Sequence, residues 1–175
     1  MSPPCRVRAT GGFALLAAWF ALANGWEPLL TVLGAAAVHE LGHWAVLRAL
    51  GAEVTGFRLS ALGAVLETDS GRLSYGGELA AVLAGPGANL LAALALTALG
   101  KGCWPAAVGA NLVLCVFNLL PIRPLDGGRA LWLLASWDWG PAAGERAARW
   151  TGAVTAASLA GLIACVMRRT GGSLW

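Results

Sequence analysis

The chain has 175 residues, of which 58% are apolar and 12% are charged, and it contains 24 Gly and 9 Trp. Globular proteins usually carry roughly 25% charged residues, so a soluble domain of this length would lack the polar surface that it needs. The net charge of +3 comes from scattered arginines rather than from a basic patch, and this excludes the usual footprint of nucleic-acid binding. We therefore expect a protein whose solvent is largely lipid.

The first half of the chain contains two apolar segments, which are followed by a more polar segment. Residues 13–23 end like a secretory signal, but more membrane-like sequence follows, so we expect an uncleaved first span. Residues 28–50 begin with a proline and are long enough to cross roughly 30 Å of hydrocarbon. Residues 53–77 are more polar and partly alternating, which predicts a small hairpin or sheet at the membrane surface.

Four further apolar runs follow, at residues 78–99, 104–120, 130–137 and 142–167. Residues 121–128 between them contain two prolines and a Gly pair, which is incompatible with ordinary helix. The predicted fold is an all-α polytopic membrane protein with about six transmembrane segments and the small hairpin or sheet after the second. The four cysteines show no short pairing or CxxC spacing, so we expect small buried hydrophobic residues at positions 5, 103, 115 and 165.

The basic residues predict the orientation. If the N-terminus is cytoplasmic, nine of the twelve fall on the cytoplasmic side and three outside, which is the bias that multi-pass proteins show. We therefore expect a multi-pass protein of the cell membrane with both termini in the cytoplasm. The nine are Arg6, Arg8, Arg48, Arg58, Arg72, Arg123, Arg129, Arg168 and Arg169, and the three are Lys101, Arg146 and Arg149.

Chemistry is concentrated in the second apolar segment, where residues 39–43 read His-Glu-Leu-Gly-His. His39 and His43 are the only histidines of the chain, and a spacing of four places both imidazoles on one helix face, where they can share a metal. Glu40 lies one position on, close enough to take a proton from a water that the metal activates. A hydrogen-bonded pair of core histidines is the alternative, but ionisable groups inside a membrane helix favour a functional site.

A catalytic zinc site takes three protein ligands and leaves one position open. Because both histidines are used, the third ligand must be a carboxylate or a thiolate. Asp126 is the strongest candidate, since it follows a broken helix and precedes two glycines that allow close backbone approach. Glu27, Glu78 and Asp138 lie nearer the span ends, where a solvated carboxylate needs no explanation. A helix N-cap is the alternative role for Asp126.

The predicted topology is compatible with this ligand set. The second span brings His39 and His43 into its cytoplasmic half, and the fourth span returns to the same side just before Asp126. We therefore expect an active site toward the cytoplasmic side.

Residues 39–43 and residues 118–128, Asn-Leu-Leu-Pro-Ile-Arg-Pro-Leu-Asp-Gly-Gly, together resemble the paired motifs of the site-2 proteases, which are intramembrane zinc metalloproteases. Residues 84–89, Ala-Gly-Pro-Gly-Ala-Asn, resemble the motif of that family in the intervening span. The resemblance implies one catalytic Zn²⁺ bound by His39, His43 and Asp126, with Glu40 as the catalytic acid and base.

The same resemblance suggests residues that bind substrate or support the site, namely Asn118, Pro121, Gly85, Pro86 and Asn89. Close helix packing is the alternative role for residues 85–89, and hydrogen bonding to the broken backbone is the alternative for Asn118. The plan is similar to the compact, sporulation-type branch of the family. We expect a single integral-membrane metalloprotease domain over residues 1–175, without a PDZ or CBS domain.

The function that the resemblance implies is hydrolysis of a peptide bond in or near the transmembrane segment of a membrane-tethered protein substrate. A membrane regulatory protein and the lipid bilayer are the other expected partners. The predicted hairpin would hold an unwound substrate segment as an added strand. A non-proteolytic metal-binding membrane protein or a metal transporter is the alternative, although a transporter would need more polar residues along a path through the bilayer.

Overall fold

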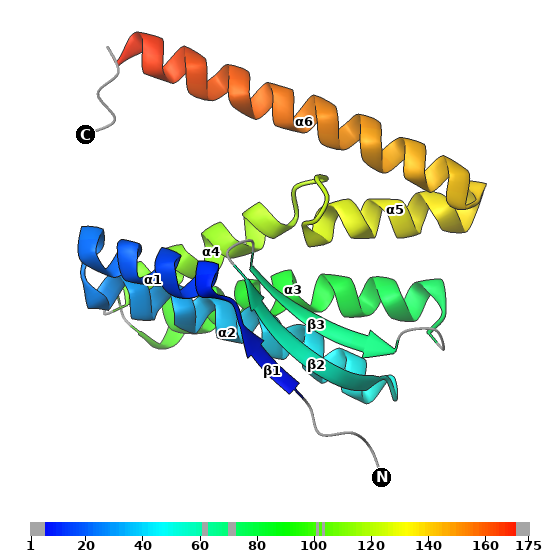
Figure 1. Ribbon diagram of the computed structural model, residues 1–175, viewed down its shortest axis with the longest axis horizontal. Helices are drawn as coiled ribbons and strands as arrows, with labels where there is room; N and C mark the ends of the chain where they lie inside the picture. The colour runs from blue at the N-terminus through cyan, green and yellow to red at the C-terminus, as the bar shows by residue number, and fades with distance from the viewer. Residues whose placement is uncertain (1–5, 61–62, 70–72, 101, 103, 171–175) are drawn as a thin grey trace. The chain divides into compact units, whose positions relative to one another are not determined.

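The computed structural model describes residues 6–60, 63–69, 73–100, 102 and 104–170 (Figure 1). The chain divides into two compact units, Met1–Phe117 and Asn118–Trp175. The first contains the strands β1 (Arg6–Ala9), β2 (Glu53–Ser60) and β3 (Gly63–Asp69) and the helices α1 (Gly11–Asn24), α2 (Trp26–Ala49) and α3 (Tyr75–Leu99). It also contains α4 (Pro105–Asn118) except for the last residue of that helix, Asn118, which falls in the second unit. The second contains α5 (Asp126–Trp139) and α6 (Pro141–Arg169).

The first two helices are separated by a single residue, Gly25, whose φ of 92° is accessible to glycine at little cost. Its N–H donates to the carbonyl of Ala21 at 2.8 Å and so closes the last turn of α1. Pro28 is the third residue of α2, in the first turn, where a missing backbone N–H breaks no intrahelical hydrogen bond. The predicted second segment is therefore a helix that begins two residues earlier than its proline.

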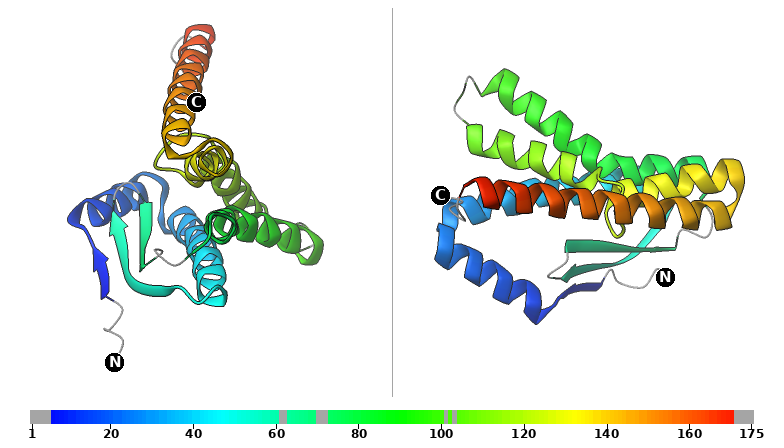
Figure 2. Two further views of the ribbon diagram at one scale, coloured as in Figure 1. Left: turned by 90° about the vertical axis from the view of Figure 1, so that its right-hand side faces the viewer. Right: turned by 90° about the horizontal axis from the view of Figure 1, so that it is seen from above.

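The segment after α2 forms β2 and β3, which pair antiparallel from Glu53 with Asp69 to Ser60 with Gly63. The register shifts between Val54 and Gly56, and β2 bends strongly along its length in the left view of Figure 2. Bulges of this kind increase the local twist of a strand. The sheet has the order β1-β2-β3, because β1 adds in parallel to β2. The β1 strand was not predicted.

Helix α3 begins at Tyr75, three residues before the predicted start. Ser74 is its N-cap, and the Ser74 hydroxyl accepts a hydrogen bond from the backbone N–H of Gly77 at 3.2 Å. A capping serine satisfies one of the free N–H groups of the first turn. The polar stretch that was predicted to extend to residue 77 therefore ends in the cap of α3.

Helices α2 and α3 pack closely through small residues. A Cβ atom added to Gly42 would lie 2.6 Å from Cβ of Ala88 and would also overlap the carbonyl oxygen of Ala84. Small residues of this kind let membrane helices approach at backbone distance. This close approach places the C-terminal half of α2, around Gly42, directly against the middle of α3.

In the second unit, the loop 119–125 folds back on the first turn of α5. A Cβ atom on Gly127 would overlap the backbone of Leu119, and one on Gly128 would lie 2.6 Å from the carbonyl carbon of Ile122. The prediction that these glycines allow close backbone approach is confirmed. Residues 121–128 were all predicted to be non-helical. For residues 126–128 this prediction is wrong, because α5 already begins at Asp126. Leu125 is the N-cap, so Asp126 is not.

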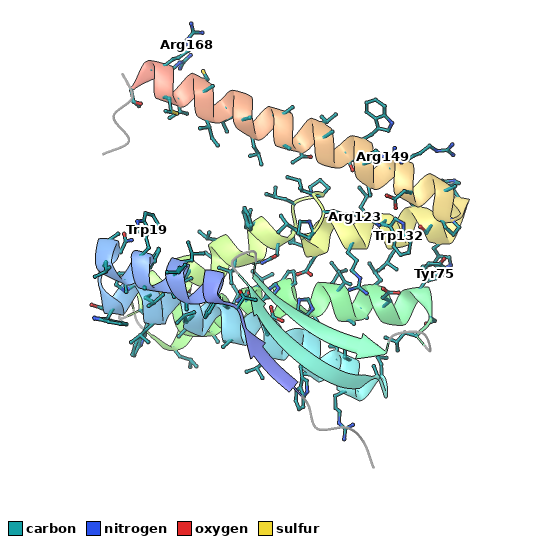
Figure 3. All side chains as sticks on the ribbon, viewed as in Figure 1. Trp19, Tyr75, Arg123, Trp132, Arg149 and Arg168 are labelled. Atoms are coloured by element: carbon teal, nitrogen blue, oxygen red, sulfur yellow. The ribbon has the colours of Figure 1, made fainter. Side chains whose placement is uncertain are left out.

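Arg123 connects this loop to both helices of the second unit. Its Nη1 atom lies 3.1 Å from Oε2 of Glu145 on α6, and its guanidinium lies over the Trp132 ring on α5, 5.5 Å from the centroid (Figure 3). The peptide bond between Arg123 and Pro124 is cis. After Gly140, which has a φ of 83°, α6 turns back and then diverges from α5 (Figure 1).

The six helices occupy the six predicted apolar segments. Of these, α2, α3 and α6 are long and apolar enough to cross a membrane, whereas α1 and α4 are apolar but shorter. Large apolar side chains are exposed throughout, as with Leu22, which is 89% exposed, and Leu99, which is 82% exposed. Lipid is the solvent that such a surface requires. Crossing by all six helices stays a prediction.

The prediction of buried cysteines holds for one residue and is wrong for another. Cys115 on α4 is buried, but Cys165 on α6 is exposed. With 29 residues, α6 is about twice as long as the 14-residue α5 against which it packs, so its C-terminal half extends past that helix. Cys5 and Cys103 lie outside the described residues.

Candidate metal site

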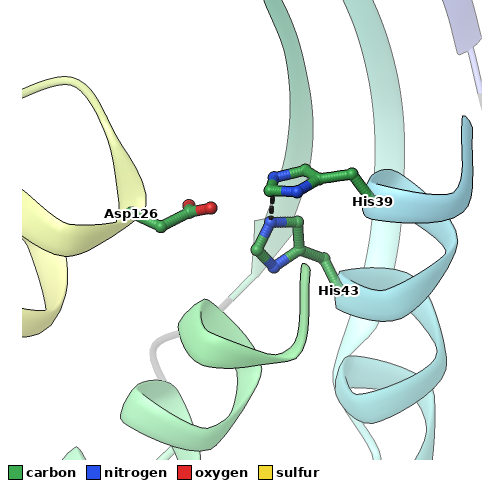
Figure 4. A group of neighbouring side chains, drawn as sticks. All are labelled: His39, His43 and Asp126. Atoms are coloured by element: carbon green, nitrogen blue, oxygen red, sulfur yellow. Dashed lines mark hydrogen bonds between the residues drawn. The ribbon is translucent and has the colours of Figure 1, made fainter. Parts of the chain in front are cut away.

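Helix α2 carries His39 and His43 one turn apart and directs both rings to the same side, as the spacing predicts. The ring centroids lie 4.6 Å apart, with an angle of 83° between the ring planes. The two Nε2 atoms face each other at 3.0 Å (Figure 4). His39 is only 6% exposed, and His43 is half-buried.

The other nitrogen of each ring has its own partner from α3. Nδ1 of His43 lies 2.8 Å from the carbonyl oxygen of Ala81, and Nδ1 of His39 lies 2.8 Å from Oδ1 of Asn89. Both partners are oxygen acceptors, so both Nδ1 atoms carry the proton and donate. When both rings are neutral, this arrangement leaves the two Nε2 atoms unprotonated and facing each other.

Two nitrogen lone pairs at 3.0 Å repel unless a cation lies between or beside them. A proton or a metal ion can supply that charge. In a tetrahedral zinc site with Zn–N bonds of about 2.05 Å, two nitrogen ligands are about 3.3 Å apart, close to the separation seen here. Metal-bound histidines usually donate their second ring N–H to a carbonyl or carboxylate, as both rings do here. The donor set therefore fits zinc.

Gly85 makes room for the two rings. A Cβ atom at this position would overlap the His43 imidazole and lie 2.8 Å from Cε1 of His39. Pro86, the next residue, is fully buried inside α3. The motif at residues 84–89 therefore packs against the histidines through Gly85, and its Asn89 supplies an acceptor to His39.

Asn89 is completely buried, and all of its polar atoms have partners. Its Nδ2 donates to the carbonyl of Ala35 at 2.9 Å and to Oδ1 of Asn111 at 2.8 Å, while its Oδ1 accepts from His39. Sequence reasoning did not select Asn111. The available signal was an amide inside the apolar run at residues 104–120, where a polar side chain needs a partner.

The other proposed site residues are placed as follows. Glu40 is half-buried on α2, next to His39. Asn118, Pro121 and Asp126 belong to the second unit: Asn118 ends α4, Pro121 lies in the loop that follows, and Asp126 is the first residue of α5. The first unit thus brings together His39, His43, Gly85, Pro86 and Asn89, with Glu40 beside them in the chain.

No protein-family model matches this chain, but individual known proteins resemble it. A Mycobacterium tuberculosis protein provisionally named the zinc metalloprotease Rip3 is 35% identical over 133 residues, which is 68% of this chain and 33% of Rip3. A protein of Synechocystis, also provisionally named a zinc metalloprotease, is 33% identical over 58% of this chain and 29% of its own length. The chain thus matches about a third of the length of these relatives.

The fold has a solved counterpart, the site-2 protease of Methanocaldococcus jannaschii. The two structures superpose with a TM-score of 0.65 and 25% sequence identity, over 87% of this chain and 77% of the archaeal chain. Together with the histidine pair and the apolar helices, these similarities place the chain among membrane proteins related to the zinc metalloproteases. The chain belongs to the site-2 protease family.

Proposed function

We propose that this chain is an intramembrane zinc metalloprotease that hydrolyses a peptide bond in or near the transmembrane segment of a membrane-tethered protein. The observation that carries the proposal is the histidine pair, whose Nε2 atoms converge at 3.0 Å while both Nδ1 atoms are held by acceptors on α3. The relatives named as zinc metalloproteases and the fold of the archaeal site-2 protease support it.

In this proposal His39, His43 and Asp126 are the protein ligands of one zinc ion. Bound zinc would polarise a water molecule and the scissile carbonyl. Asp126 is a suitable third ligand because its position at the start of α5 is fixed by the two glycines that follow it. Its carboxylate would complete the three-ligand set that a catalytic zinc site requires.

The part assigned to Glu40 is proton transfer. Its carboxylate would accept a proton from the attacking water and later donate a proton to the leaving amine. Because Glu40 follows His39 on the same helix, rotation of about 100° per residue places it beside the ligands rather than among them. A carboxylate at this position would lie beside a water that the ligand side of the helix holds, where a general base is needed.

The distribution of buried polar side chains favours a protease over a metal transporter. The buried polar residues of the described first unit are His39, Asn89 and Asn111, and hydrogen bonds join all three. A transporter needs polar groups spread along a path through the bilayer. A single connected group supports a fixed site instead.

The proposal also covers the membrane in which the chain lies, its orientation there and the proteins that bind it. The bias of basic residues supports cytoplasmic termini, a cell-membrane location and a site toward the cytoplasm. A membrane-tethered protein would be the substrate, and a second membrane protein would regulate access. Similarity to the sporulation-type branch remains part of this proposal.

The test is co-expression with candidate single-span proteins. Glu40→Ala should retain zinc but lower cleavage by at least about 100-fold, since a positioned general base typically contributes 10²–10⁴-fold. Glu27→Ala is the matched control, because Glu27 is exposed in the first turn of the same helix, and it should cleave like the unmodified chain. Cleavage that survives Glu40→Ala would contradict the protease assignment. Zinc binding without cleavage of any candidate would favour the metal-binding alternative.

A further inference from the structure

Asn111 is a buried amide on a helix that carries none of the proposed ligands. It lies in the middle of α4 and is 4% exposed. Its Nδ2 donates to the carbonyl of Ala107 at 2.9 Å, one turn back on α4, so its Oδ1 must face away from that carbonyl. That oxygen accepts from Asn89 at 2.8 Å.

A directed series of hydrogen bonds therefore runs from α2 through α3 to α4. His39 donates to Asn89, Asn89 donates to Asn111, and Asn111 donates to the Ala107 carbonyl. Every link has one donor and one acceptor only if each amide keeps its present orientation. The backbone carbonyl at Ala107 cannot donate, so it sets the direction of the whole series.

We propose that Asn111 is a positioning residue for zinc binding, because it holds the Asn89 amide in the orientation that keeps the His39 proton on Nδ1 and leaves Nε2 free for the metal. This inference rests on the proposed function, since it concerns the zinc that the function requires. It assigns to α4 a part in the metal site although α4 supplies no ligand.

The physical reason lies in the two faces of the Asn89 amide. In the opposite orientation its NH₂ group would face Nδ1 of His39, which would favour the proton on Nε2, where it blocks the metal. That orientation would also bring Oδ1 of Asn89 against two acceptors, the Ala35 carbonyl and Oδ1 of Asn111. Asn89 is completely buried and Asn111 is 4% exposed, so solvent does not relieve such a contact. Asn111 thus supplies one of the two contacts that oppose the flip.

The test compares zinc affinities of the purified full-length chain by competition with a chelator. Asn111→Leu removes the acceptor and should weaken zinc binding about 10- to 100-fold, the usual effect of losing a partner outside the ligand set. Asn111→Asp keeps an oxygen acceptor and, as a neutral acid, can still donate to Ala107, so its affinity should stay within about threefold. Cys115→Ala is the matched control, one turn away on the same buried face of α4, and should bind zinc like the unmodified chain.

A double-mutant cycle shows whether Asn111 acts through Asn89. In an Asn89→Ala background, Asn111→Leu should cause no further loss of zinc affinity, because the amide that it orients is gone. Additive losses would overturn the inference. Equal zinc affinity in the unmodified chain and Asn111→Leu would also overturn it while leaving the proposed function intact. Absence of zinc binding by the unmodified chain would overturn the proposed function and this inference with it.

Nitrogen NMR gives a readout that does not depend on the metal. The chain has only two histidines, so ¹⁵N-labelled imidazoles give few signals to assign. Zinc-free unmodified chain should show His39 protonated at Nδ1, and folded Asn111→Leu should show a population protonated at Nε2. An unchanged Nδ1–H tautomer in the variant would contradict the proposed positioning role.

Discussion

Gly85 lies so close to the imidazole of His43 that a single added methyl group would overlap the ring. The same methyl group would lie 2.8 Å from Cε1 of His39, inside van der Waals distance. One missing side chain on α3 therefore provides the space in which both rings of α2 can turn their Nε2 atoms toward each other.

Substituting Gly85 should consequently damage the metal site. Gly85→Ala should lower zinc affinity at least about 10-fold and reduce the free energy of unfolding by about 1–3 kcal/mol, the usual cost of overpacking. Chelator competition measures the first quantity, and denaturation in detergent measures the second. Gly87→Ala is the control, because a Cβ at Gly87 has no neighbour within 4 Å. Full zinc affinity in Gly85→Ala would show that the rings do not need this space.

The third ligand can be identified by zinc content. Asp126→Asn removes the negative charge with little change of shape and should weaken zinc binding by more than about 100-fold. Loss of a residue that only hydrogen-bonds to a metal ligand typically weakens binding by about 10- to 100-fold, so a larger loss identifies a ligand. Asp138→Asn is the matched control, because Asp138 is an exposed carboxylate near the other end of the same helix. If Asp138→Asn loses zinc and Asp126→Asn keeps it, the assignment of Asp126 is wrong.

The sheet offers a testable place for the substrate. With the order β1-β2-β3, the strand β2 is paired on both sides, whereas β3 has a partner on one side within the described residues. An unwound substrate segment that pairs with β3 as an added strand would form backbone hydrogen bonds with it, and these would replace the helical hydrogen bonds that the substrate loses on unwinding. Photo-crosslinking groups placed in turn at residues 63–69 should capture a substrate bound to Glu40→Ala. Residues 6–9 on the opposite edge serve as the comparison, and capture there alone would move substrate docking to β1.

Patterns with strong local rules could be predicted from sequence. The spacing of His39 and His43 determines that they share a helix face, and the glycines after Asp126 indicate a close backbone approach that the structure contains. The hairpin segment could be located from its alternation, and β2 and β3 lie within it. Each of these depends on residues near one another in the chain.

Features that depend on distant residues could not be predicted in this way. The short strand β1 is formed only because β2, more than 40 residues later, offers it an edge. The partnership of Asn89 with Asn111 joins different helices, and no single segment contains the information that they meet. The start of α3 depended on the Ser74 cap, which lies in a polar stretch that was assigned to the surface segment as a whole.

The spacing of the arginines in helix α6 can be compared directly with the thickness of a membrane. Arg149 precedes a long uncharged stretch of this helix, and Arg168 follows it. The two arginines lie toward opposite ends of the helix (Figure 3). The 18 residues from 150 to 167 between them carry no charge, and at 1.5 Å per residue they extend about 27 Å. That length matches the roughly 30 Å hydrocarbon thickness with little tilt, so the first two turns of α6 would stand in the headgroup region.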